Sequence, residues 1–499
     1  MLLGGLDPGP DADSLLSTFW KTYKIQHPTH KIFSMGLDMA RTIPMMIHGD
    51  GARTAKKQPL EVVSLIAVLG LDTKEDVNCH CPRPFCYSKD FSIDDPMVQK
   101  LNNRHHSYLH HFLMFCFPGK RYKATPGLLK SMLRRISEDL SECCQQGIYV
   151  DGDPRPYHIG IIGLRGDAEW HSKTGVLNRS YRNVGHVNQI PCCHQCDAGA
   201  PGIPFESFRS DAEWKSTIGR TVPWSLEPPY APIQFEPWDN GSSAKFFRYD
   251  PFHVFRLGIA RNFCASAIVY FCNEGLYDFP GDDHSVPGRL GRAWASFLLF
   301  CETDGKKPAS MRSFSKEKLH YSTTTSFPFV SCKGSDTILL LQYLKWFSGL
   351  QICHGNTSEG VRLVKKGSEQ GLNFQGFHRH GLWLNPQCRD YICKMCRGFC
   401  HTYSRLAAHA YGRQMTLFGL VPKAHSLGHI YVDLESSRAN QYTLNAGVWD
   451  TSMSEDFVGQ VGRQSRRVGY KNLVHNTLLA YRIRMKFVIK RFKKNNRTR

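Results

Sequence analysis

The pattern of apolar and polar positions predicts two β-strands near the start of the chain. The apolar run TIPMMIHG, at residues 42–49, ends at Asp50. After a short basic turn, the run LEVVSLIAVL at residues 60–69 is β-branched and typical of a buried strand. A short polar turn between two such runs indicates a hairpin, so we expect these two strands to pair.

An amphipathic helix and a further strand follow. Pro126 opens a segment in which apolar residues recur with helical spacing, and Gly147 closes it. Directly afterwards, the run YHIGIIGL at residues 157–164 is apolar and ends shortly before Asp167. Two predicted buried strands therefore each end beside an aspartate.

The remaining pattern divides the chain into segments. Residues 201–250 are rich in Pro, Trp and Gly, which indicates an extended connection, and the apolar runs of the next 170 or so residues have helix length. Later, Ser452 and Glu455 match an S-x-x-E capping box, which places Glu455 in the first turn of a helix. We predict five segments in this order: an N-terminal segment (1–41), the first part of an α/β core (42–200), a mostly helical insertion (201–421), the last part of the core (422–475) and a basic C-terminal tail (476–499).

The charge balance changes the picture of possible partners. The 499 residues include 63 Lys and Arg against 43 Asp and Glu, a formal net charge of +20. A chain this basic attracts polyanions, of which nucleic acid is the foremost. Residues 463–499 contain no acid and have apolar residues at helical spacing, which predicts a basic amphipathic helix with a tail. Contact with DNA and a nuclear-import signal both fit this segment, and both point to the nucleus.

The same composition argues against membrane and secreted proteins. The apolar stretch at 253–272 is interrupted by Arg256 and Arg261, so no membrane span is expected. The first residues lack the basic and apolar regions of a signal peptide. We therefore expect the 18 cysteines to lie in a reducing compartment, where they and the 23 histidines are candidate metal ligands.

Two residue pairs have the spacing of a zinc site. Cys193 and Cys196 form a C-x-x-C, and His425 and His429 form an H-x-x-x-H. Together they would complete a Cys₂His₂ tetrahedron that joins the two ends of the insertion. Taken alone, a C-x-x-C is common and the histidines would be ordinary core or surface residues.

Three acids are candidate ligands for Mg²⁺. Asp50 and Asp167 follow predicted strands, and Glu455 lies on a predicted late helix. Two-metal phosphoryl transfer requires carboxylates from separate elements to gather around the ions. Alternatively, the aspartates are only turn residues and Glu455 only caps its helix. If the acids do form a metal site, the neighbouring Asp456 is the alternative to Glu455 as the third acid.

Other cysteine clusters and motifs add less. Two further groups are candidates for a second zinc site. The first is Cys79, His80, Cys81 and Cys86, and the second is Cys388, Cys393, Cys396, Cys400 and His401. The alternative is that these cysteines are buried free thiols. The sequence has no G-x-x-x-x-G-K-[ST] and no G-x-S-x-G. P-loop hydrolysis of ATP and serine hydrolase chemistry are therefore not supported.

The motifs occur in an order that resembles one family. They are HGDGARTAKKQPLEVVSL, the GD of GLRGDAEW, the C-x-x-C, the H-x-x-x-H and the final Glu. The combination resembles DDE transposases of the CACTA/Mirage/Chapaev type and, more distantly, the catalytic core of the vertebrate V(D)J recombinase. The segment DPFHVFRLGIARNF, from Asp250, also looks like a block within the insertion of those transposases, with Arg256 or Leu257 in place of the family's acid.

The resemblance implies a fold and a set of site residues. The fold would be α/β, with a ribonuclease-H-like mixed sheet core interrupted by a large, mostly helical insertion. The implied catalytic acids and magnesium ligands are Asp50, Asp167 and Glu455. The implied ligands of a structural zinc are Cys193, Cys196, His425 and His429.

The resemblance also implies an activity. It would be cut-and-paste transposition, in which Mg²⁺ or Mn²⁺ supports cleavage of double-stranded DNA at transposon ends and strand transfer into target DNA by a homo-oligomer in the nucleus. The residues expected to contact DNA phosphates are Arg53, Lys56, Lys57, Arg466, Arg467 and Lys471. Because nothing before Asp50 looks like a DNA-binding module, a domesticated, catalytically inactive DNA-binding protein is the alternative. A zinc-containing interaction module without a nucleic acid role is the third possibility.

Overall fold

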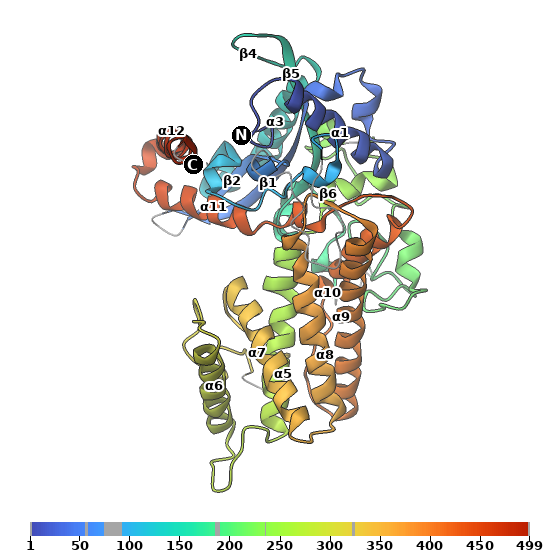
Figure 1. Ribbon diagram of the computed structural model, residues 1–499, viewed down its shortest axis with the longest axis vertical. Coiled ribbons are helices and arrows are strands. Elements are labelled where there is room, and N and C mark those ends of the chain that lie inside the picture. Colours follow the sequence, from blue (N-terminus) through green and yellow to red (C-terminus); the bar gives the residue numbers. More distant parts are fainter. Residues whose placement is uncertain are drawn as a thin grey trace.

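The chain forms a sheet-based part and a helical part, which lie one above the other along the long axis of the molecule (Figure 1). The computed structural model describes residues 2–54, 58–73, 92–184, 190–234, 236–321 and 325–497. Both helices and a mixed sheet are present, so the predicted α/β class is confirmed.

The central sheet has six strands. They are β1 (Thr42–Arg53), β2 (Pro59–Ala67), β3 (His111–Pro118), β4 (Ile148–Val150), β5 (Asp153–Arg165) and β6 (Phe247–Arg248). Their order is β3-β2-β1-β5-β4, and β6 also pairs with β5. Strand β2 is antiparallel to both β1 and β3, and β4 is antiparallel to β5, whereas β5 is parallel to β1 and β6 is parallel to β5.

The predicted hairpin and the predicted third strand are confirmed as β1, β2 and β5. Strand β3 was not predicted from the sequence pattern. The structure shows that the run HFLMFCFP pairs with β2 along its length. Its aromatic residues favour a strand, and a partner that is distant in sequence decides between a strand and another state.

Each face of the sheet has its own apolar core. On one face, Val63 and Leu65 pack with α1 and α3, from which Phe19 and Leu133 are buried. On the other face, Val62 packs with α11 and α12, because successive strand residues point to opposite faces. The helices of this part are α1 (Pro10–Gln26), α2 (Gly119–Ala124), α3 (Leu128–Gln145), α4 (Ala168–Thr174), α11 (Ser452–Ser465) and α12 (Leu473–Arg497).

The helical part has a separate core. Helices α5, α7, α8 and α9 lie side by side as a bundle, and α6 stands at its edge (Figure 1). The helices are α5 (Ala260–Asn273), α6 (Val286–Thr303), α7 (Gly334–Cys353), α8 (Glu359–Phe374), α9 (Pro386–Gly412) and α10 (Pro422–Ser436). A π-helical segment, η10 (Phe252–Ile259), leads directly into α5.

The stretch Phe252–Asn273 is long and apolar enough to cross a membrane by length and composition. However, 78% of its most apolar window is buried inside the protein. This degree of burial is typical of a core helix in a bundle, and the surrounding helices account for it.

Two predicted boundaries differ from the observed elements. Residues 201–250 contain short 3₁₀ helices and β6 in addition to extended chain. The predicted tail at 476–499 is helical as far as Arg497, because α12 has already begun at Leu473 and packs on β3 through the buried Tyr481.

Short 3₁₀ helices join the main elements at Lys31–Ser34, Met39–Arg41, Leu71–Thr73, Pro96–Val98, Ser107–Leu109, Tyr181–Asn183, Glu213–Thr217, Ala231–Ile233, Gly241–Phe246, Gln375–Arg379, Ala446–Trp449 and Tyr470–Asn472.

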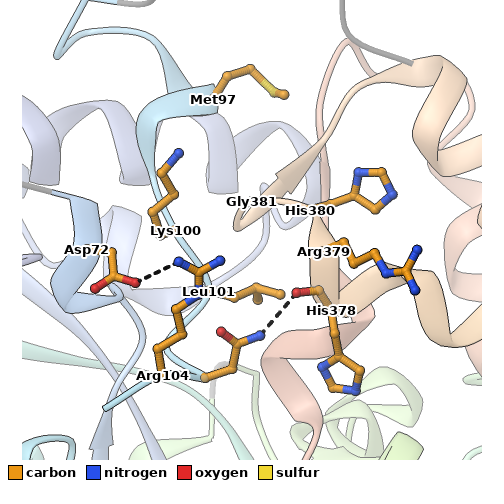
Figure 2. Close-up of a pocket in the computed structure, with 10 residues that line it drawn as sticks. Asp72, Met97, Lys100, Leu101, Arg104, His378, Arg379, His380 and Gly381 are labelled. Carbon is orange, nitrogen blue, oxygen red and sulfur yellow. Dashed lines mark hydrogen bonds and ion pairs between the residues drawn. The ribbon is translucent and has the colours of Figure 1, made fainter. Parts of the chain in front are cut away.

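A packed junction joins the two parts after α8. Strand β7 (Trp383–Leu384) pairs with β8 (Thr443–Leu444), and the backbone N–H of Leu382 donates to the carbonyl of Gln99 at 2.8 Å. Figure 2 shows a small pocket here, in which Arg104 points toward Asp72 and forms an ion pair with it at 3.3 Å. Across the junction, Asn103 donates to the carbonyl of His378 at 3.4 Å. The pocket has a volume of about 30 Å³, so the two parts are in close contact here.

Candidate metal centres

The register of the sheet places the two aspartates beside each other. In the parallel pair of β1 and β5, His48 lies opposite Arg165. Asp50 and Asp167 each follow this pair by two residues, so both lie at the same end of neighbouring strands. Asp167 also caps α4, since its Oδ1 accepts a hydrogen bond from the backbone N–H of Trp170 at 2.6 Å.

Glu455 completes the group from a distant part of the sequence. It lies in the first turn of α11, as predicted. The pKa of Asp50 is raised well above its ordinary value, first by burial, then by the charge of Glu455 and a hydrogen bond with it, and then by the charge of Asp167. The structure thus brings the three predicted acids into one electrostatic group.

The predicted capping box is shifted by one residue. Thr451, not Ser452, precedes the first helical residue, and its carbonyl accepts from the N–H of Glu455 at 2.9 Å. The Thr451 side chain makes no capping bond, and the N–H of Ser452 donates to Oδ1 of Asp450 at 3.0 Å. Glu455 is therefore not used as a capping residue, and its carboxylate is free to face Asp50.

Asp456, the alternative third acid, has other partners. Its Oδ2 accepts hydrogen bonds from Ser107 at 2.7 Å and from Gln460 at 2.6 Å. These contacts attach α11 to the segment that leads into β3. Of the two adjacent acids, Glu455 is the one coupled to Asp50.

Glycine precedes both aspartates because an indole occupies the space beside them. A Cβ at Gly49 would lie 1.9 Å from Cζ2 of Trp170, and a Cβ at Gly166 would lie 2.7 Å from its Cδ1. Trp170 is buried in the first turn of α4, the helix that Asp167 caps. The two Gly-Asp pairs and this tryptophan therefore fix the spacing of the two strand ends.

Replacing Gly49 with Ala is expected to destabilise the protein by about 3 kcal/mol or more, because the new methyl overlaps the Trp170 ring. The matched control is Gly51→Ala on the same strand, where no atom lies within 4 Å of the new Cβ. The control should change stability by less than about 0.5 kcal/mol. Urea unfolding followed by circular dichroism measures both, and equal midpoints for the two variants would contradict this packing.

A buried arginine holds the start of α11 against the sheet. Arg165, on β5, donates to the carbonyl oxygens of Val448 at 2.7 Å and Asp450 at 3.1 Å, and to Oγ of Ser454 at 3.0 Å. Its burial makes these bonds costly to break. Arg165 thereby positions the turn that carries Glu455.

His253 is a site residue that sequence analysis did not single out. Its Nδ1 lies 2.6 Å from Oδ2 of Asp250, and its Nε2 lies 3.5 Å from Oε1 of Glu455. Burial alone would lower the pKa of His253, but its hydrogen bond with Asp250 and the charges of Asp250, Glu455 and Asp50 raise it to about 9. A positively charged imidazole therefore lies beside the acids at neutral pH. The only sequence signal was its place in the segment that begins at Asp250.

The four predicted zinc ligands converge. Their ligand atoms all lie within 4.8 Å of one another, and all four residues are buried. Sγ of Cys193 lies 3.3 Å from Nε2 of His429, and Sγ of Cys196 lies 3.3 Å from Nε2 of His425. A tetrahedron with bonds of about 2.0 to 2.3 Å has ligand atoms roughly 3.3 to 3.8 Å apart. The donor set and its spacing therefore fit a metal ion such as zinc.

Neighbouring aromatic residues hold these ligands in place. Trp214 packs against both imidazoles, with ring centroids 4.5 Å from His425 and 5.0 Å from His429. The hydroxyl of Tyr249 lies 2.9 Å from Sγ of Cys193. Although burial would raise it, the pKa of Cys193 lies well below its usual value because Cys196 and the two histidines stabilise the thiolate. A thiolate is the form that binds metal.

The other cysteine clusters do not form a comparable group in the described part of the chain. Cys79, His80, Cys81 and Cys86 lie outside the described residues. On α9, the thiols of Cys393 and Cys396 face the carbonyls of Tyr431 and Leu427 on α10, at 3.5 and 3.8 Å. Within the described ranges, the Cys₂His₂ group is the one with metal-ligand geometry.

The predicted DNA-contacting residues that the structure describes are on the surface. The side chains of Arg53, Arg466, Arg467 and Lys471 are exposed, and Nε of Arg466 donates to the carbonyl of Arg53 at 3.1 Å. The end of β1 and the end of α11 thus form one basic surface, close in sequence to Asp50 and Glu455. Lys56 and Lys57 lie outside the described residues.

Among the described residues, the Cys₂His₂ group has the geometry to hold a metal such as zinc. The three acids are linked by their charges and do not form a comparable group. Comparisons of the chain with models of known protein families and with curated protein sequences give no match.

Proposed function

We propose that this protein is a DDE-type DNA transposase, resembling the CACTA/Mirage/Chapaev group, that cleaves DNA and transfers its strands with Mg²⁺ or Mn²⁺. The observation that carries the proposal is the grouping of Asp50, Asp167 and Glu455. These residues come from two strand ends and a late helix, the arrangement that two-metal phosphoryl transfer requires.

The sheet order supports a ribonuclease-H-like core. Three antiparallel strands, β3, β2 and β1, are followed in space by β5 and β6, which run parallel to β1. The first acid lies near the end of the central strand and the second lies just after its parallel neighbour. The long helical segment enters between β6 and the helix that carries the third acid, as the resemblance implies.

The chain's own residues would prepare the reaction at this site. Asp50, Asp167 and Glu455 would hold the divalent ions, and a bound cation would offset the burial and mutual repulsion that raise the pKa of Asp50. When bound, such ions lower the pKa of an attacking water or 3′-hydroxyl and neutralise the phosphate. His253 orients the Glu455 carboxylate from the side of Asp250, and Arg165 fixes the turn behind it.

Zinc would have a structural role in this scheme. The C-x-x-C lies before the helical part and the histidines lie on α10, the last helix of that part, with a sequence separation of 236 between Cys193 and His429. An ion held by both pairs closes this long segment into a loop anchored beside the acids. The nuclear location and the homo-oligomer on DNA remain predictions from the basic composition and the resemblance.

The direct test is incubation of the protein with supercoiled plasmid DNA and Mg²⁺. Nicked or linear product that disappears with EDTA supports the proposal. Salt-dependent DNA binding without cleavage under any divalent ion would favour the inactive, domesticated alternative. Absence of both would contradict a role in DNA chemistry.

DNA affinity should decrease steeply with salt, and the basic surface at the end of α11 should account for part of the slope. Replacing Arg466, Arg467 and Lys471 with Gln should reduce the log–log slope by up to about 2.7, at about 0.9 per phosphate contact. Deleting α12 is a poorer test, because its Tyr481 is buried in the core. Fluorescence anisotropy of labelled duplex DNA over a salt series measures the slope.

The matched control removes the same charge from the helical part. Lys345, Lys366 and Lys394 are exposed on α7, α8 and α9. Replacing them with Gln should leave the slope unchanged. An equal decrease for both triple variants would mean that the predicted surface has no special role.

A further inference from the structure

A large cavity opens beside the carboxylate group, and the function proposed above assigns no ligand to it. Its volume is about 570 Å³, and Asp167 and His253 belong to its lining. It is bounded by the end of β5, by α4, by η10 and by the start of α10. A ligand in this cavity would therefore lie next to the acids, on the side of the Cys₂His₂ group.

Apolar and aromatic side chains make up much of the cavity wall. Leu177, Val254 and Leu257 contribute aliphatic surface, and Tyr181 and Phe329 contribute rings. Phe329 is 40% exposed and Tyr181 is 37% exposed, which is high for aromatic residues. Such a wall suits a flat, weakly polar group, since aromatic side chains stack on any nucleobase.

One polar group in the lining lacks a partner. Nε2 of His171 is buried and has no hydrogen bond among the described residues. The whole side chain is only 3% exposed. A buried polar atom of this kind is costly unless a ligand or water satisfies it. It offers a hydrogen bond to a heteroatom of a planar ring.

Basic side chains gather at the same cavity, whose lining includes Arg179, Arg248, Arg261 and Lys423. Asp167 and Asp250 also line it, and their charges act on Lys423. Arg261 donates to the carbonyl of Cys332, and Nζ of Lys423 lies 3.5 Å from the carbonyl of Leu257. Their charges are available to an anion, such as a phosphate attached to the ring.

The backbone of η10 is distorted where it borders the cavity. Gly258 has φ −115° and ψ −115°, outside the helical region, and a Cβ there would lie 2.7 Å from the carbonyl of His253 and from Cδ of Lys423. Gly258 thus forms a kink that divides η10. Here the distortion allows η10 to supply His253, Val254 and Leu257 to one cavity.

We propose that this cavity binds a nucleotide, with its base against the apolar wall and its phosphate toward Arg261 and Lys423. The nucleotide comes from DNA, as a residue unstacked from the strand that lies at the carboxylate group. In naming DNA as the source, this inference rests on the proposed function. A free nucleotide has the same chemistry, and the experiment separates the two sources.

The first experiment uses 2-aminopurine deoxyribonucleoside monophosphate as a fluorescent probe for the full-length protein. Its anisotropy should rise on binding, and inorganic phosphate should compete far less well than dAMP. Equal competition by phosphate would mean that only an anion is bound and would overturn the proposal. No rise in anisotropy at any protein concentration would also overturn it.

Two variants test the location of the nucleotide. Leu257→Trp fills the cavity, and Lys423→Glu reverses an exposed charge without disturbing the core. Each should weaken probe binding by about tenfold or more, because the indole ring of the first variant takes the space of the base and the carboxylate of the second repels the phosphate. Leu299→Trp, on the exposed face of α6, is the matched control and should bind as the wild type does. Unchanged binding by both cavity variants would place the nucleotide elsewhere.

The second experiment uses a short duplex that contains one 2-aminopurine. Its fluorescence should rise when the protein binds in Ca²⁺, because the base leaves the stack, and Leu257→Trp should abolish the rise while duplex affinity remains. Duplex binding without this rise would overturn the DNA source even if the free probe binds. Plasmid cleavage measured on the same preparation reports separately on the proposed function, so the two failures are distinguishable.

Discussion

An Asp50→Asn variant is expected to lose Mg²⁺-dependent DNA cleavage, by about a thousandfold or more, while retaining most of its DNA binding. Asn has the same shape but no charge, and a metal ligand contributes several kcal/mol of transition-state stabilisation. DNA binding depends instead on exposed basic residues such as Arg466, which the substitution leaves unchanged. Plasmid nicking and duplex anisotropy measure the two properties.

The same variant should be more stable than the wild type when metal is absent. Burial and the charges of Glu455 and Asp167 raise the pKa of Asp50, so its ionised form is unfavourable in the folded protein. A neutral amide removes that repulsion. Thermal unfolding in EDTA should show a higher Tm for Asp50→Asn, and Mg²⁺ should raise the Tm of the wild type only.

The control for this pair of results is Asp456→Asn. Asp456 adjoins Glu455 but bonds to Ser107 and Gln460, so its loss should leave cleavage within a fewfold of the wild type. If Asp456→Asn abolished cleavage and Asp50→Asn retained it, the assignment of the acids would be wrong.

A Cys196→Ser variant is expected to lose its bound metal and about 5 kcal/mol or more of stability. The binding free energy of a structural zinc is part of the folding free energy, and this ion would join segments more than two hundred residues apart. Elemental analysis of the purified protein and its thermal unfolding with and without a chelator measure the two losses. Protection of the residues after β6 from proteolysis should decrease as well.

Cys192→Ser is the matched control, because Cys192 is the buried neighbour of Cys193 but is not among the four converging residues. It should keep the metal content and the melting temperature of the wild type. Unchanged metal content and Tm in Cys196→Ser would rule out the zinc centre.

Sequence reasoning found the parts of the site that local patterns encode. Strands β1 and β5 are runs of buried apolar residues, so the position of Asp167 just after β5 could be read from the chain, whereas β1 continues past Asp50 to Arg53 because it stays paired with β2. The C-x-x-C and H-x-x-x-H are spaced by ligand geometry, which is also local. Each of these patterns, the apolar run of a strand or the spacing within one ligand pair, spans only a few residues.

Features that depend on distant partners were not found. Strand β3 depends on pairing with β2. The role of Trp170 in setting the distance between the two strand ends is evident only from its contacts with Gly49 and Gly166 in the folded protein. His253 gains its charge from Asp250, Asp50 and Glu455, of which only Asp250 is near in sequence. The shifted helix start at Thr451 is a one-residue difference, which capping patterns do not resolve.

The order of the elements along the chain has a consequence for synthesis. The sheet partner β5 is made early, but α11, with Glu455, is made only after the whole helical part. The N-terminal sheet therefore emerges from the ribosome long before its second face can be covered, since Phe457, Val461 and Tyr481 are still missing. A chain interrupted before α11 would contain both aspartates and the C-x-x-C but no complete acid group. Cleavage of DNA would thus be confined to finished molecules, and the exposed face of Val62 would mark unfinished ones for chaperones or proteases.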